Sequence, residues 1–86
     1  MKTKIVKNIY NSNKYSILKN CFYFCKCRDE NFYNVFSNNF ITEDYILNNF
    51  QTEQTDSGVF LFDTIEDAQE LLDYLEPFFV MEKLVN

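Results

Sequence analysis

The chain has 86 residues, and 47% of them are apolar, which is enough to fill one small core. It contains no histidine, the commonest general base near neutral pH, and its single glycine cannot form a phosphate-binding loop. We therefore expect one domain over residues 1–86 that is not an enzyme and needs no cofactor or metal.

The first third of the chain has the pattern of a β-hairpin. Residues 4–10 are rich in β-branched and aromatic side chains, residues 11–13 (Asn-Ser-Asn) are a turn signal, and residues 15–27 form a second extended run. A further turn is expected over residues 28–31. Residues 31–40 fit a short helix or an irregular strand equally well.

A helix is predicted in the middle of the chain. Thr42 is a candidate N-cap, and two acids follow it in the first turn. The apolar residues expected to share one face of this helix are Ile46, Leu47 and Phe50. Residues 51–57 carry no large apolar side chain and predict a loop, and Gly58 then opens a strand over residues 59–62.

The strongest helical pattern begins at Thr64, a candidate N-cap with Asp67 three residues later in the place of a capping-box Glu. The apolar residues that follow fall within a sector of about 120° around the helix axis. They are Ile65, Ala68, Leu71, Leu72 and Leu75. Pro77 is expected to stop this helix, and residues 78–85 are expected to form a final strand.

These elements predict an α+β fold, a small single-domain two-layer sandwich. Its sheet is expected to be mixed or antiparallel and to have about four strands, with one or two helices on one face. The strands come from the N-terminal hairpin and from a C-terminal β-α-β unit.

The residue usage indicates where the protein works. No apolar run is long enough for a signal peptide or a membrane span. Three cysteines, an odd number, do not make a disulfide framework, so we expect a cytoplasmic protein. Asn, Lys, Ile, Phe and Tyr are abundant, which indicates a low-GC bacterium or a virus or plasmid that lives in one.

The three cysteines lie close together, within residues 21–27. A structural zinc site needs four ligands, and the fourth could only be an acid such as Asp29 or Glu30. In a single strand, alternation would place Cys21, Tyr23, Cys25 and Cys27 on one face. We favour thiols packed against a sheet, and we expect three reduced thiols and no metal.

Charge is divided along the sequence. Residues 1–28 hold seven of the eight basic residues and no acid, whereas residues 29–86 hold all thirteen acids and only Lys83 as a cation. The two parts carry +7 and −12, which together give the net charge of −5. Such a division points to an electrostatic partner rather than to a reaction.

The acids of the last predicted helix are expected on the side opposite its apolar sector. Glu66, Glu70 and Asp73 recur at four and three residues, so they lie about 4.5–6 Å apart along the helix axis. This interval is similar to the spacing of phosphates on a nucleic-acid strand. An ordinary solvated surface explains any one of these acids, but explains less well why so long a stretch has one cation. The residues predicted to bind a partner are Asp63, Glu66, Asp67, Glu70, Asp73, Glu76, Glu43 and Asp44.

Two alternatives stay open. The lysines of the N-terminal hairpin alternate with aromatic residues, a mixture that single-strand nucleic-acid binders use. The same lysines would also protect the edge of a hairpin, and the net charge opposes binding to a polyanion. Alternatively, the protein is a housekeeping subunit whose two oppositely charged parts pair head to tail in a homo-oligomer such as a homodimer.

The preferred interpretation is a non-enzymatic module that places its acids on a basic, nucleic-acid-handling host protein. In size, charge and residue usage the chain resembles the small acidic proteins with which phages and plasmids of low-GC bacteria block host defence nucleases, anti-CRISPR proteins among them. The resemblance implies an inhibitor that mimics nucleic acid. We expect no membrane partner and no direct binding to nucleic acid.

Overall fold

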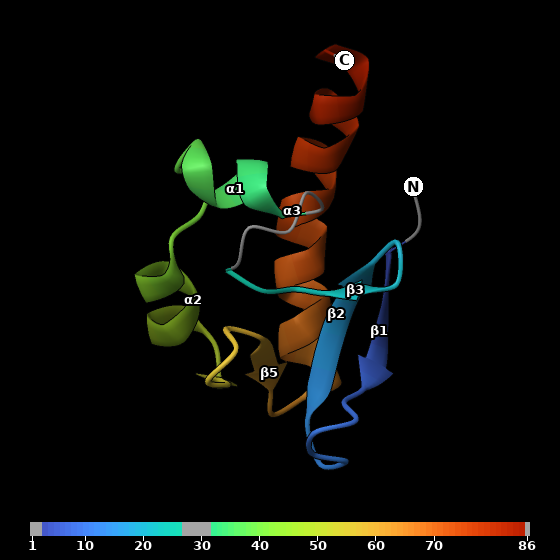
Figure 1. The fold of residues 1–86 in the computed structure, drawn as a ribbon, viewed down its shortest axis with the longest axis vertical. Helices are drawn as coiled ribbons and strands as arrows, with labels where there is room; N and C mark the ends of the chain where they lie inside the picture. Colours follow the sequence, from blue (N-terminus) through green and yellow to red (C-terminus); the bar gives the residue numbers. More distant parts are fainter. Residues whose placement is uncertain (1–2, 27–31, 86) are drawn as a thin grey trace.

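One antiparallel sheet and three helices make up the part of the chain that a computed structural model describes, residues 3–26 and 32–85. In chain order the elements are β1 (Thr3–Lys7), β2 (Tyr15–Lys19), β3 (Phe22–Tyr23), α1 (Tyr33–Ser37), α2 (Glu43–Asn49), β4 (Thr52–Gln54), β5 (Phe60–Phe62) and α3 (Ile65–Val85). The strands lie in the order β1-β2-β5-β4, and β3 pairs with β2. All three helices contribute to the main core, so the predicted two-layer α+β fold is confirmed (Figure 1).

The predicted N-terminal hairpin is present, but its second strand is shorter than expected. β1 and β2 pair with Ile5 opposite Ile17. β2 ends at a two-residue turn, Asn20 and Cys21, whose φ angles of 54° and 70° suit a type I′ hairpin. The chain therefore reverses into β3, and the single strand predicted over residues 15–27 is wrong.

The two segments with the weakest apolar pattern both contain regular structure. Residues 31–40 include the short helix α1, which buries Val35. The loop predicted over residues 51–57 is wrong in its first half, because β4 pairs there with β5. β4 is an edge strand with polar side chains, so it lacks the apolar alternation that identifies a strand. The turn predicted over residues 28–31 lies outside the described residues.

The final strand predicted over residues 78–85 is also wrong, because α3 continues through Pro77 to Val85. Proline cannot donate a hydrogen bond to the Asp73 carbonyl and usually ends a helix. Here Pro77 and Asp73 are both exposed, so water can solvate that carbonyl. Beyond the proline, Phe79 continues the buried stripe and is 1% exposed. The centre of its ring lies 6.1 Å from the ring centre of Phe32. This packing favours a continuous helix.

The core lies between the sheet and the helices. The apolar sector predicted for α3 is confirmed at four positions, all at most 4% exposed: Ala68, Leu71, Leu72 and Leu75. Ile65 was expected with them but is 45% exposed, because it is the first residue of the helix and lies at the margin of the sector. Leu47 of α2 is likewise exposed, since it lies about 100° around the helix from the buried Ile46.

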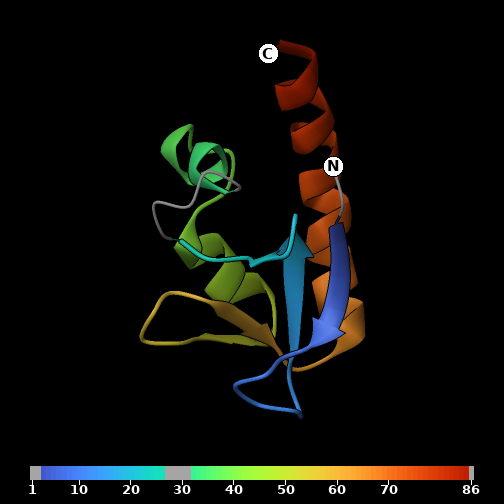
Figure 2. The ribbon, with the colours of Figure 1, turned by 45° about the vertical axis from the view of Figure 1, so that its right-hand side comes forward.

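A smaller apolar cluster covers the other face of the sheet. Cys25, Val59 and Leu61 are buried there, and Tyr23 packs against them. Alternation along β5 explains the division, because Phe60 and Phe62 face the helices while Leu61 points the other way. The last turns of α3 extend past the ends of the strands in both views (Figures 1 and 2).

Candidate partner-binding surface

Helix α3 begins where the sequence predicts and presents acids to solvent. The Thr64 Oγ1 atom accepts a hydrogen bond of 3.1 Å from the backbone N–H of Asp67, so the predicted N-cap is confirmed. The exposed acids opposite the buried stripe, which we call the acidic surface, are Glu66, Glu70 and Asp73. All three are held on one rigid helix, whose position is fixed by the core beneath it.

The acids of the acidic surface have few partners. Within the described parts of the chain, the carboxylates of Glu66 and Glu70 form no hydrogen bond or ion pair. Asp73 accepts a hydrogen bond of 2.8 Å from the amide of Gln69, a neutral group one turn earlier. The negative charge of these three carboxylates is therefore not compensated by a described cation of the fold.

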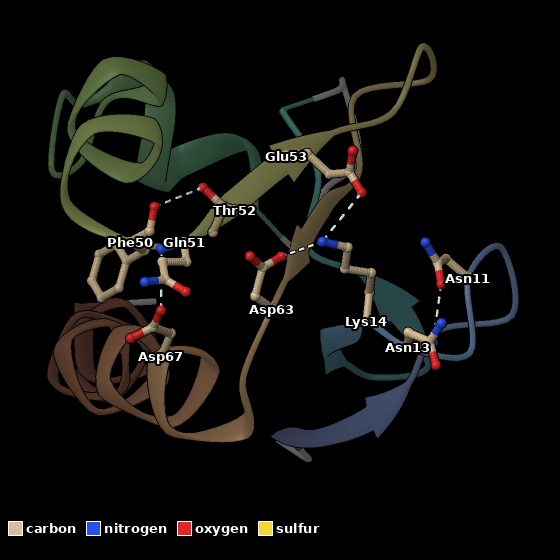
Figure 3. A network of polar contacts seen from close by, with 9 residues as sticks. All are labelled: Asn11, Asn13, Lys14, Phe50, Gln51, Thr52, Glu53, Asp63 and Asp67. Atoms are coloured by element: carbon tan, nitrogen blue, oxygen red, sulfur yellow. Dashed lines mark hydrogen bonds and ion pairs between the residues drawn. The ribbon is translucent and has the colours of Figure 1, made fainter.

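Two further predicted acids of α3 serve the fold. The Asp67 carboxylate is partly buried and accepts a 3.1 Å hydrogen bond from the backbone N–H of Gln51, which joins α3 to the start of β4 (Figure 3). Glu76 accepts a 3.1 Å hydrogen bond from the hydroxyl of Thr3 on β1. Asp67 is thus occupied with the backbone, whereas Glu76 remains exposed beside its neutral partner.

Asp63 does not belong to the unpaired acids. Its carboxylate accepts a hydrogen bond from the Lys14 ammonium, which also lies 3.7 Å from Glu53 (Figure 3). The hydrogen bond from Lys14 to Asp63 is the main reason that the pKa of Lys14 is raised above its ordinary value. A lysine of the N-terminal hairpin therefore neutralises acids from β4 and from the end of β5, which the order of residues does not reveal.

Glu43 is paired in the same way. Its carboxylate accepts hydrogen bonds of 2.9 Å from the Lys26 ammonium and 2.9 Å from the Gln54 amide. These bonds, that from Lys26 first, lower the pKa of Glu43 below its ordinary value. The neighbouring Asp44 is exposed and is not part of this pair.

The predicted N-cap of α2 is confirmed, since Thr42 accepts a 3.1 Å hydrogen bond from the backbone N–H of Tyr45.

The eight predicted acids thus fall into two groups. The first group is bound within the fold: lysines from the basic part of the chain bind Asp63 and Glu43, and the backbone N–H of Gln51 binds Asp67. The acids that stay exposed and without a described cation are Glu66, Glu70, Asp73, Glu76 and Asp44. Four of these five lie on α3, so the excess negative charge is concentrated on one helix.

Among the described residues, few cations of the basic hairpin are both exposed and unpaired. Besides the paired Lys14 and Lys26, Lys19 is only 5% exposed and places its Nζ atom 4.2 Å from the centre of the Phe79 ring. Lys4 and Lys7 are exposed on β1, which is an edge strand. This arrangement fits lysines that protect a sheet edge.

Cys21 and Cys25 do not share one face, contrary to the prediction. Cys21 lies exposed in the β2–β3 turn, whereas the buried Cys25 thiol donates a 3.4 Å hydrogen bond to the carbonyl of Ser57. Cys27 lies outside the described residues. The described residues contain no group of three or more side chains suited to a metal. The absence of metal stays a prediction, which elemental analysis of the purified protein would check.

Two exposed apolar features of α3 were not predicted from the sequence. Val80 and Met81 are 53% and 58% exposed beyond Pro77, where a strand was expected. Tyr74 is 45% exposed and stacks on Tyr45 of α2, with ring centres 6.0 Å apart. The signal for Tyr74 was in the sequence, because it follows Glu66 and Glu70 at the four-residue spacing of one helical ridge.

None of the described helices combines the length and the hydropathy needed to cross a bilayer. Comparison of the chain with protein-family models, with curated proteins and with solved structures gives no match. The candidate site therefore rests on the residues and their geometry.

Proposed function

We propose that this protein is a non-enzymatic binding module whose acidic surface occupies a basic, nucleic-acid-binding site of a host protein. The proposal includes the biological setting suggested by size and composition, an inhibitor of host defence carried by a phage or plasmid, as anti-CRISPR proteins are. The observation that supports it is the sorting of the acids. Lysines reach Asp63 and Glu43, whereas Glu66, Glu70 and Asp73 lie on one helix with no described cation beside them.

The attraction to such a partner is electrostatic. Carboxylates at intervals of about 4.5–6 Å along a helix axis present a row of negative charge to a partner. A basic groove that normally binds phosphates would attract this row and accelerate association. Because a helix is already ordered, the row is formed before the partner arrives, and little conformational entropy is lost on binding.

The first experiment identifies the partner and tests the surface together. Wild-type protein and a triple variant, Glu66→Lys, Glu70→Lys and Asp73→Lys, are used to capture proteins from a low-GC bacterial lysate. We expect the wild type to retain a nucleic-acid-handling protein that the triple variant does not retain. The affinity of the wild type for this partner should fall steeply between about 50 mM and 500 mM salt, because the screening length shortens from roughly 14 Å to 4 Å.

A matched pair of single variants separates position from net charge. Glu70→Lys and Asp56→Lys change the net charge equally, and both residues are exposed, but Asp56 lies in the turn before Gly58. We expect Glu70→Lys to weaken binding about tenfold or more and Asp56→Lys to have a small effect, as for a charge outside an interface. Nucleic acid should compete for the partner. An equal loss of affinity in Glu70→Lys and Asp56→Lys, or wild-type affinity in the triple variant, would contradict the proposal.

A further inference from the structure

A strip of five aromatic rings runs between α2 and α3 beside the acidic surface. Successive ring centres are separated by 6.2 Å, 6.0 Å, 5.2 Å and 4.5 Å. In that order the rings belong to Phe50, Tyr45, Tyr74, Phe40 and Phe78. The phenylalanines are partly buried against the main core, whereas the two tyrosines are nearly half exposed.

The exposed tyrosine pair is held in place from both helices. Tyr45 and Tyr74 are 44% and 45% exposed, and their rings are inclined by only 24°. The Tyr74 hydroxyl donates a 3.4 Å hydrogen bond to the carbonyl of Phe40. The backbone N–H of Tyr45 is bound by the N-cap of α2. The Tyr45 ring also packs on Phe50, so both exposed rings belong to one packed aromatic strip.

The tyrosine pair is continuous with the acidic surface. Glu66, Glu70 and Tyr74 succeed one another every four residues, so they form one ridge of α3, and all three are exposed. Glu70 is the helical neighbour of Tyr74 and has no described partner of its own. A ligand that covers Tyr74 thus lies within reach of an uncompensated carboxylate.

We propose that this ridge selects arginine rather than lysine side chains on the basic partner. A guanidinium group is planar, stacks on aromatic rings and is weakly hydrated, so it can cover the tyrosine pair while its N–H groups donate to Glu70. An ammonium group carries the same charge but is compact and strongly hydrated, and it gains less from the ring face. This inference rests on the proposed function, because it names the side chain that the acidic surface binds.

The test compares two synthetic peptides of equal length and charge, in which glycine alternates with five arginines or with five lysines. Dissociation constants are measured by NMR titration at low salt. We expect the arginine peptide to bind the wild type about two- to fivefold more tightly, the factor that corresponds to one exposed cation–π contact. Its addition should shift the ring signals of Tyr45 and Tyr74 more than those of Tyr33, which is 52% exposed on α1.

Three variants locate the preference. The double variant Tyr45→Leu, Tyr74→Leu should bind both peptides equally, whereas Tyr33→Leu should keep the preference for arginine. Tyr74→Phe retains an aromatic ring and should also keep the preference for arginine. If the double variant does not fold, the ring shifts of the wild type show whether the arginine peptide binds at Tyr45 and Tyr74.

The possible failures differ from one another. Equal affinity of the wild type for both peptides, or a preference that survives in the double variant, overturns the arginine inference and leaves the acidic surface intact. Loss of all peptide binding in the Glu66, Glu70, Asp73 triple-lysine variant is expected in either case. No binding of either peptide to the wild type would count against the proposed function as well.

Discussion

The two faces of α3 obey different constraints. On the inner face, the fully packed residues are at most 4% exposed, and they are Ala68, Leu71, Leu72, Leu75 and Phe79. On the outer face, Glu66, Glu70 and Asp73 are exposed and lack a described cation, and Val80 and Met81 are exposed beyond them. Packing requires the inner face to be apolar and of a given shape, but nothing in the described fold requires the outer face to be acidic.

This difference indicates where function is to be sought. Elsewhere some charges are paired within the fold, as when Lys14 binds Asp63 and Lys26 binds Glu43. Net charge alone would also keep the protein soluble, but solubility does not need the charge to be on one helix. Variants that alter one face of α3 at a time test this difference.

The largest effect is expected on the inner face. Leu72→Ala removes a side chain that is 4% exposed and leaves a cavity between α3 and the sheet. We expect the free energy of unfolding to fall by about 2–5 kcal/mol, measured by urea denaturation. The matched control is Val80→Ala on the outer face, which is 53% exposed and should change stability by less than about 0.5 kcal/mol. Equal losses from both variants would show that the faces are not distinct.

The next largest effect concerns the continuity of α3. Pro77→Ala restores a backbone N–H that can bond the Asp73 carbonyl in the middle of the helix. Removing a proline from a helix interior raises the free energy of unfolding by about 3 kcal/mol. The greater conformational freedom of the unfolded chain without this proline lowers it by about 0.4–1 kcal/mol. We therefore expect a stabilisation of about 2 kcal/mol. Circular dichroism should show unchanged or higher helix content, and a loss of stability would contradict a helix through residue 77.

Much of α3 was predictable from the sequence, and its end was not. Thr64 identified the N-cap, and the spacing from Ala68 to Leu75 identified the buried face, because both signals are local. Asp67 was expected to complete a capping box, but its carboxylate accepts a hydrogen bond from Gln51. Pro77 is a local signal too, and here it was misleading. What outweighs it is the tertiary packing of Phe79 against Phe32, forty-seven residues earlier in the chain.

The candidate site shows the same division. The sequence identified Glu66, Glu70 and Asp73 correctly as exposed, because helical periodicity places them opposite the apolar sector. It did not distinguish them from Asp63 and Glu43, because the lysines that bind those acids come from distant parts of the chain. A charge count along a sequence does not contain that pairing.

A smaller effect is expected for a paired acid. The pKa of Glu43 is lowered in the folded state by hydrogen bonds from Lys26 and Gln54, so its pairing stabilises the fold above the ordinary pKa of 4.5. That stability is lost as the pH falls through the lower folded pKa. Glu43→Gln should therefore destabilise the protein at pH 7 by less than about 1 kcal/mol, the usual value for an exposed pair.

The pH dependence of the same variant provides the control. At a pH low enough to protonate Glu43 in the folded state, wild type and Glu43→Gln should have the same urea midpoint, because neither then carries the charge. Glu70→Gln is the comparison on α3, where no described pair exists to be lost, and its midpoint should differ little from the wild type at either pH. A larger loss for Glu70→Gln than for Glu43→Gln at pH 7 would contradict the assignment of Glu43 as the paired acid.

Only a small effect on stability is expected for the variant that matters most for function. Changing Glu66, Glu70 and Asp73 together to lysine moves the net charge from −5 to +1, since each substitution adds two charges. Glu66 lies in the first turn, where an acid favours the helix dipole by about 0.3–1 kcal/mol, and this contribution is lost. Against it, three lysines reduce the repulsion among the remaining acids of α3. We expect a net change below about 1 kcal/mol in the free energy of unfolding, far less than that of Leu72→Ala. Such a result would make loss of partner binding in this variant a property of the surface and not of the fold. If the variant instead unfolds, the outer acids are structural, and the distinction between the two faces of α3 fails.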